Sequence, residues 1–203
     1  MLIKLRIMDI STIEKYDSAK MYKIYDKWPE IAEKSFGMDI EAINYKNIEH
    51  IVFAGMGGSG AIGDMFSAIL SKTKIHVNVV KGYVLPTTVN PKTLVIIVSV
   101  SGNTIETLTL LKSAHKRKCK IIGFSSGGKV LDFCKKNKIE HRFVTQYSSP
   151  RASFTSYVYT ILKVLHSTLE IEEEDIVESI NELKKISKKI NSTNLTHSNP
   201  SLN

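Results

Sequence analysis

The sequence predicts a doubly wound α/β domain, in which a parallel sheet of five strands is covered by helices on both faces, with helical extensions at both ends. Short apolar runs alternate along the chain with longer stretches of helical periodicity. The strongest run, Thr93–Val100, is apolar on both faces, which is typical of a strand buried inside a parallel sheet. A length of 203 residues, with 42% apolar and 24% charged residues, fits one such domain plus appended helix.

Residues 1–36 are expected to form an N-terminal helical segment. Between Ser18 and Phe36, apolar residues recur at spacings of three and four, which is the period of an amphipathic helix. Pro29 lies inside this stretch and cannot donate a backbone hydrogen bond. We therefore expect two short helices here rather than one long one.

Residues 37–169 are expected to form the sheet domain. Apolar, β-branched runs bounded by turn residues predict strands at 48–55, 75–80, 93–100, 119–124 and 140–144. Helical patterns alternate with these runs at 59–71, 104–118, 129–137 and 152–169. Strands that alternate with helices predict parallel pairing, because each parallel pair needs a long crossover connection.

Residues 170–190 are expected to form a C-terminal helix, and residues 191–203 a tail or a linker. The apolar residues of the helix recur on one stripe, at Ile176, Ile180, Leu183, Ile186 and Ile190. The tail is rich in Asn, Ser and Thr and shows no periodicity, so we expect no regular structure there.

Charge and cysteine content argue against several classes of protein. The formal net charge is +8, but the lysines are dispersed without interleaved aromatic residues, so we expect no nucleic-acid partner. Cys119 and Cys134 have neither CxxC spacing nor a nearby pair of histidines, so we expect free thiols and no metal. No stretch approaches the roughly 20 apolar residues that cross a bilayer, so we expect a cytoplasmic protein without a membrane partner.

The first glycine-rich loop, Gly55–Gly60, follows a predicted strand and precedes a predicted helix. Its glycines match a dinucleotide fingerprint, but the next strand, within 75–82, offers no acidic residue to hold a ribose. A nucleotide P-loop is excluded because Gly60 is followed by Ala61 and Ile62. We therefore expect no cofactor. The glycines instead permit a tight turn that, with the helix N-terminus behind it, suits a phosphate.

A second loop, 99–104, follows the strongest predicted strand and carries three hydroxyl groups. Ser99, Ser101 and Thr104 surround Gly102, and the next predicted helix starts at Thr104. Ser99 and Ser101 share the parity of one strand face, and Thr104 lies where a first-turn side chain meets an anion. Alternatively, Asn103 or Ser101 caps the helix and the other hydroxyls face solvent. Two such loops at adjacent strand ends favour a phosphate cradle.

Four segments together resemble a known family, the archaeal-type bifunctional phosphoglucose/phosphomannose isomerases. The segments are Gly55–Asp64, Ser99–Thr107, Ser125–Lys129 and Ser149–Ser153. The resemblance runs from about Tyr16 to the end of the predicted helix 152–169, and the order and spacing of the four segments carry it. It covers only the N-terminal sugar-isomerase (SIS) domain of that family.

The resemblance implies a SIS domain with a flavodoxin-like sheet and a hexose 6-phosphate as ligand. It implies that the phosphate is bound by Gly57, Gly58, Ser59, Ser99, Ser101 and Thr104. It further implies that Arg151 lies beside C1 and C2 of the open-chain sugar and stabilises the enediolate during aldose–ketose isomerisation. A guanidinium directed at developing negative charge is an effective electrostatic catalyst. Alternatively, Arg151 is a surface arginine that follows a proline turn.

A complete isomerase also needs a base to move the proton between C1 and C2, and an acid to open the ring. In the family these groups lie in a second SIS domain, and this chain ends near where that domain begins. The acids and histidines at hand are poor substitutes by their positions, namely Glu106, Glu172–Asp175, His141, His166 and His197. The sequence therefore predicts the binding groups and Arg151, but no general base.

Three functions follow from this pattern. The chain is a truncated or split glucose 6-phosphate/mannose 6-phosphate isomerase, a sugar-phosphate-binding protein without catalysis, or a sensor whose ligand regulates a partner. A single SIS domain leaves exposed the face that a second one covers, so we expect a homodimer or a partner SIS domain.

Overall fold

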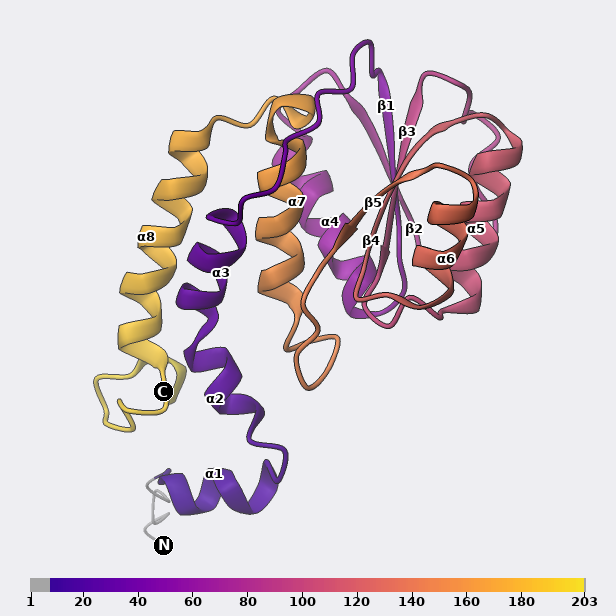
Figure 1. The fold of residues 1–203 in the computed structure, drawn as a ribbon. Helices are drawn as coiled ribbons and strands as arrows, with labels where there is room; N and C mark the ends of the chain where they lie inside the picture. The colour runs from indigo at the N-terminus through magenta and orange to yellow at the C-terminus, as the bar shows by residue number, and fades with distance from the viewer. Residues whose placement is uncertain (1–7, 203) are drawn as a thin grey trace, which may run out of the picture.

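A computed structural model describes residues 8–202 of the chain. Its centre is a parallel sheet with the strand order β2-β1-β3-β4-β5, seen nearly edge-on in Figure 1. The strands are β1 (His50–Ala54), β2 (His76–Val80), β3 (Thr93–Ser99), β4 (Lys120–Ser125) and β5 (Glu140–Phe143). The five predicted strands and the flavodoxin-like order are confirmed, and the order reverses between β1 and β3.

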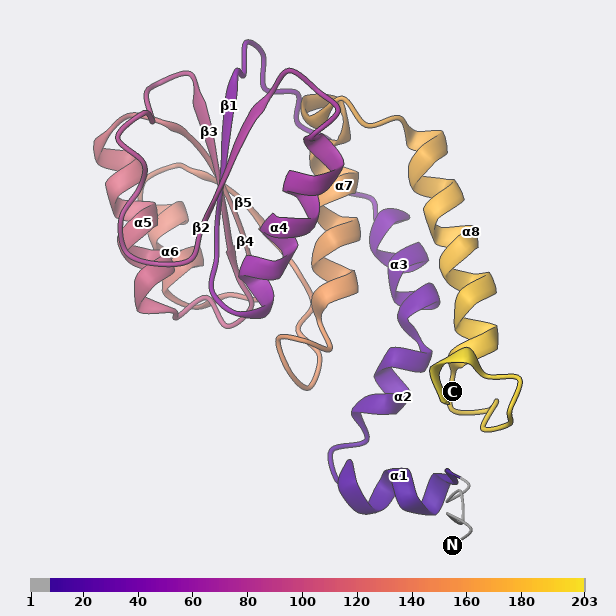
Figure 2. The ribbon, with the colours of Figure 1, turned by 180° about the vertical axis from the view of Figure 1, so that it is seen from behind.

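Helices cover both faces of the sheet, as predicted (Figures 1 and 2). The helices α4 (Gly58–Leu70) and α7 (Phe154–Leu169) lie on one face, and α5 (Ile105–Lys116) and α6 (Gly128–Lys136) lie on the other. Alternate strand residues enter the two cores: Phe53 packs with the first pair of helices, and Val52 with the second. The strands are apolar on both faces for this reason.

The N-terminal segment contains three helices, α1 (Ile10–Tyr16), α2 (Met21–Asp26) and α3 (Trp28–Phe36). Pro29 lies in the first turn of α3, where its missing N–H breaks no helical bond. The predicted pair of short helices is therefore α2 and α3. Helix α1 was not predicted, because it buries no residue and so leaves no apolar stripe in the sequence.

Helix α8 (Glu173–Ile190) packs against α3, and α3 in turn packs against α7. Figures 1 and 2 show these helices as a further layer outside the face covered by α7. Ile176 and Ile180 of the predicted stripe are buried, but Ile186 and Ile190 are 49% and 43% exposed. Only the first half of the stripe therefore contributes to the core.

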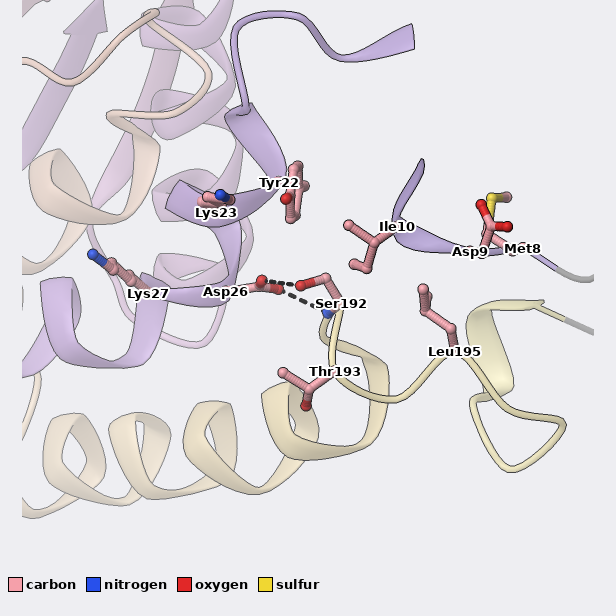
Figure 3. Close-up of a pocket in the computed structure, with 10 residues that line it drawn as sticks. All are labelled: Met8, Asp9, Ile10, Tyr22, Lys23, Asp26, Lys27, Ser192, Thr193 and Leu195. Carbon is pink, nitrogen blue, oxygen red and sulfur yellow. Dashed lines mark hydrogen bonds between the residues drawn. The ribbon is translucent and has the colours of Figure 1, made fainter. Parts of the chain in front are cut away.

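The C-terminal tail folds back onto the N-terminal segment. The Ser192 backbone N–H and hydroxyl donate to the two carboxylate oxygens of Asp26 at 3.0 and 2.5 Å (Figure 3). The tail forms turns and a short 3₁₀ helix, η1 (Pro200–Leu202), and it buries Asn199. Beside this contact lies a cavity of about 670 Å³, lined by α1, α2 and the tail (Figure 3). We call it the tail cavity.

No helix within residues 8–202 is both long enough and apolar enough to cross a bilayer. The loops that matter most leave the carboxyl ends of β1, β3 and β4, which lie side by side in the sheet. The strand order reverses between β1 and β3, and doubly wound sheets bind ligands outside the carboxyl strand ends at such a point.

Candidate binding site at the carboxyl edge of the sheet

The two predicted loops lie next to each other at the point where the strand order reverses. Strands β1 and β3 pair in parallel, with Ala54 opposite Ile97, so the loops that follow them leave the same edge. Each leads directly into a helix, α4 or α5, whose N-cap residue is Gly57 or Thr104. Neither N-cap residue makes a side-chain capping bond. The first N–H groups of both helices are therefore oriented toward the edge without a side-chain acceptor.

Backbone conformation explains the glycines at two positions of these loops. Gly57 has a φ of +53° and Gly102 a φ of +67°, values that disfavour a side chain. A Cβ added to Gly102 would lie 1.8 Å from the carbonyl oxygen of Gly127, in the third loop. The second loop can therefore close onto the third only with glycine at position 102.

The third loop, 125–128, and the first turn of α6 support the second loop. The Val130 N–H donates to the Gly102 carbonyl at 2.9 Å, and the Lys129 N–H donates to the Asn103 side chain at 3.2 Å. The third loop is itself held by Ser125, whose hydroxyl donates to the carbonyl of Gly127 at 2.8 Å. Hydrogen bonds from residues that follow β4 thus hold the loop at 99–104 in place.

Of the three predicted hydroxyl groups of the second loop, the structure brings two together. The hydroxyls of Ser99 and Thr104 lie 3.4 Å apart, and Ser99 is 1% exposed. Ser101 is exposed, and its hydroxyl accepts the N–H of Asn103 at 3.2 Å. Because Thr104 is the N-cap residue and makes no capping bond, the alternative of helix capping by Asn103 or Ser101 is not what the structure shows. In the first loop, Ser59 is 6% exposed, at the start of α4.

Arg151 lies in a turn that two serines hold in place. The Ser149 hydroxyl accepts the Ala152 N–H at 3.1 Å, and the Ser153 hydroxyl donates to the Ser149 carbonyl at 2.8 Å. The Arg151 side chain is exposed and makes no salt bridge within residues 8–202. A Cβ added to Gly58 would lie 3.8 Å from the backbone nitrogen of Arg151. The arginine turn and the first loop therefore meet.

The meeting of these two segments forms a cavity of about 700 Å³, which we call the edge cavity. It is lined by Gly57, Gly58, Ala61, Arg151, Phe154 and two aromatic residues of the N-terminal segment, Tyr25 and Trp28. Sequence reasoning missed both aromatic residues as candidates for the site. They lie on the apolar stripe of a predicted helix, and that pattern indicates packing only.

The candidate acids and bases lie outside the edge cavity. His141 accepts or donates one hydrogen bond, at 2.8 Å, with the Ser125 hydroxyl, and burial lowers the pKa of His141 to about 4. A hydrogen bond with Glu106 raises the pKa of Tyr83. The Glu106 carboxylate therefore already has a partner. His166 pairs with Glu173 at 3.3 Å. No histidine or carboxylate lines the edge cavity within the part of the chain that the structure describes.

The chain is similar to known proteins over most of its length. The sequence model of the family described as "SIS domain" matches residues 44–169. A bifunctional phosphoglucose/phosphomannose isomerase from Caldicellulosiruptor bescii is 33% identical over an alignment of 175 residues, which covers 81% of this chain and 51% of the relative. A protein of the same name from Aquifex aeolicus is 34% identical over an alignment of 182 residues, which covers 84% of this chain and 54% of the relative.

The fold is also found among solved structures. Glucosamine-6-phosphate deaminase from Thermotoga maritima aligns with a TM-score of 0.58 over 82% of this chain and 54% of its own, at 18% sequence identity. At that identity the likeness concerns the fold alone. The chain spans about half the length of the curated relatives that it matches.

Proposed function

The chain belongs to the SIS domain family, and on that premise we propose that it binds a hexose 6-phosphate at the carboxyl edge of its sheet. The observation that supports the proposal most is the pairing of two loops, at adjacent strand ends, that lead into helices without side-chain caps. Both helices begin at the same edge of the sheet, with their positive dipole ends and first N–H groups there, and helix starts of this kind bind phosphate.

In this proposal the phosphate is bound by backbone and hydroxyl groups together, without a metal. Gly57 and Gly58 contribute N–H groups at the start of α4, and hydroxyl groups come from Ser59, Ser99, Ser101 and Thr104. Hydrogen bonds to a charged acceptor are worth about twice those between neutral groups. Six such contributors are ample for a phosphate monoester.

We further propose that the chain provides one half of a phosphoglucose/phosphomannose isomerase. Isomerisation removes a proton from C2 of the open-chain aldose, forms an enediolate, and returns a proton to C1 of the ketose. Arg151 has no anionic partner in residues 8–202 and is thus free to stabilise the enediolate oxygen. The base and the ring-opening acid come, in this proposal, from a second SIS domain, in a second copy or a partner.

A second candidate function is binding without catalysis, as a sugar-phosphate sensor. One observation favours it: the described lining of the edge cavity contains a guanidinium but no histidine or carboxylate that could move a proton. The two functions share the same ligand and the same cradle. They differ only in whether the bound sugar is converted.

Turnover separates the two functions. The purified chain is incubated with fructose 6-phosphate, and glucose 6-phosphate and mannose 6-phosphate are measured by NMR. Product that disappears in Arg151→Gln, while fructose 6-phosphate still binds, supports the isomerase. Binding by calorimetry without any product would leave binding as the function of this chain on its own. Absence of binding would refute both.

The cradle is tested by two serine substitutions within one helix. Ser59→Ala removes a proposed phosphate ligand, so we expect the affinity for fructose 6-phosphate to fall about tenfold or more. Ser67→Ala makes the same change two turns further along α4, outside the cradle, and should leave the affinity unchanged. Equal affinities for the two variants would contradict the assignment of Ser59.

A further inference from the structure

Three aromatic rings from separate helices form one side of the edge cavity. We call Tyr25, Trp28 and Phe154 the aromatic wall. The rings of Tyr25 and Trp28 meet edge to face, with centroids 5.1 Å apart, and Trp28 stacks against Phe154 at 6.3 Å and 29°. Because the rings support one another, the wall is a preformed surface rather than a set of loose side chains.

The wall is continuous with the proposed phosphate cradle. Gly57 and Gly58 belong to the cradle and also line the edge cavity beside Arg151. The volume of about 700 Å³ is far larger than a phosphate group requires, and it lies within the range of pockets that hold small organic ligands. A ligand whose phosphate lies in the cradle can therefore extend into the edge cavity.

Trp28 has an unsatisfied donor. Its Nε1 atom is buried and has no hydrogen-bond partner within residues 8–202. An indole nitrogen can only donate, and a buried donor without an acceptor is costly and rare in native structures. A ligand oxygen that reaches this edge of the indole ring would supply the acceptor.

We propose that the aromatic wall binds the sugar carbon chain, and that Trp28 determines selectivity for a hexose phosphate over phosphate alone. The C–H groups of the sugar pack on the rings, and the Trp28 Nε1–H donates to a sugar oxygen. Arg151 lines the same cavity and, in this proposal, contacts the same carbon chain. This inference rests on the proposed function, because it assumes that the phosphate is bound in the cradle.

Trp28 also provides the means to test the proposal, because it is the single tryptophan of the chain. The full-length chain is titrated with fructose 6-phosphate and, separately, with inorganic phosphate. Binding is measured by calorimetry and the emission of Trp28 by fluorescence. We expect fructose 6-phosphate to change the emission with the same saturation as the calorimetric curve, and inorganic phosphate to leave the emission unchanged.

A conservative variant tests whether Trp28 donates a hydrogen bond to the sugar or only packs against its neighbours. Trp28→Phe keeps an aromatic ring beside Phe154 but removes the N–H donor. We expect its affinity for fructose 6-phosphate to fall about tenfold, while its affinity for inorganic phosphate stays within about twofold of the wild-type value. Tyr22→Phe is the matched control: it removes one polar atom from an aromatic residue of the tail cavity and should change neither affinity.

The outcomes distinguish the two proposals. If the wild-type chain binds fructose 6-phosphate, but its emission stays constant and Trp28→Phe binds equally well, the wall proposal is wrong and the proposed function stands. An equal emission change with inorganic phosphate would also overturn the wall proposal. If the wild-type chain does not bind fructose 6-phosphate at all, the proposed function fails and the wall proposal fails with it.

Discussion

The edge cavity and the tail cavity have nearly the same volume, about 700 and 670 Å³, and both take side chains from α2. Tyr25 of that helix lines the first, and Tyr22 and Asp26 line the second. They differ in whether their polar groups already have hydrogen-bond partners within the chain. In the tail cavity, Asp26 already accepts two hydrogen bonds from Ser192, and Asp9 accepts the N–H of Thr12 at 2.7 Å.

The edge cavity, by contrast, retains unused hydrogen-bonding capacity. Arg151 has no carboxylate partner and Trp28 no acceptor in the described chain, and the adjoining helices begin without side-chain caps. Groups that satisfy one another leave little for a ligand, whereas groups left unpaired on a rigid framework bind one. Hydrogen-bonding capacity, rather than volume, therefore distinguishes the proposed binding site from the tail cavity.

The largest effect that we predict comes from changing the framework of the edge site. Gly102→Ala must accommodate a Cβ that would lie 1.8 Å from the Gly127 oxygen, at a φ of +67°. A left-handed conformation alone costs a non-glycine residue about 1–2 kcal/mol, and the overlap adds to it. We expect a loss of about 3 kcal/mol in the free energy of unfolding, measured in urea, together with loss of fructose 6-phosphate binding.

A second glycine serves as the control for this variant. Gly82 has no atom within 4 Å of an added Cβ and no positive φ. Gly82→Ala should therefore change the free energy of unfolding by less than about 0.5 kcal/mol. Wild-type stability in Gly102→Ala would show that the second and third loops are not locked together.

An effect of intermediate size is expected from His141 at acid pH. Burial, together with the charges of Arg142 and Lys135, lowers the pKa of His141 from 6.5 to about 4. As the pH falls through 6.5, the unfolded chain takes up a proton before the folded one, so stability is lost between pH 6.5 and 4. At about 1.4 kcal/mol per pKa unit, the loss is at most about 3 kcal/mol, and less because His141 is only partly buried.

The variant that tests this prediction is His141→Gln, which keeps a donor for the Ser125 hydroxyl but does not titrate. Urea unfolding is compared at about pH 7 and about pH 4.5. We expect the wild-type chain to lose more stability than the variant between the two conditions. Identical losses in both proteins would show that the pKa of His141 is not lowered.

The smallest effect is expected at the tail cavity. Asp26→Ala removes the acceptor of two hydrogen bonds from Ser192, and at this partly exposed contact we expect a loss of about 1 kcal/mol. Amide hydrogen exchange at residues 192–199 should accelerate, while the affinity for fructose 6-phosphate stays unchanged. A lower affinity would show that the two cavities are coupled through α2.

The sequence predicts those parts of the fold that depend on neighbouring residues. Runs such as Ile51–Ala54 show β-branched, apolar strands directly, and Pro29 marks the boundary between α2 and α3 because it lacks an N–H. The contact between Asp26 and Ser192 joins positions 166 residues apart, and no local pattern predicts it. The tail was therefore expected to be without regular structure.

The candidate site is predicted to a similar extent. The glycines and hydroxyls of the two loops follow strand ends, so the topology of a parallel sheet brings them to one edge. The contribution of Tyr25 and Trp28 could not be predicted, because an aromatic residue on an amphipathic helix fits a core and a ligand cavity equally well. Only the packing of α2 against α3, and of α3 against α7, places them beside Arg151.

The hydrogen bonds between the second and third loops have a consequence for how such a site changes over evolutionary time. Because the Val100 carbonyl accepts hydrogen bonds from the Ser126 N–H and hydroxyl, a substitution at Ser126 in the third loop alters the shape of the second loop without lying in it. Loops 99–104 and 125–128 are therefore expected to diverge as a pair, and the preference for the proposed ligand can change through residues that do not contact it.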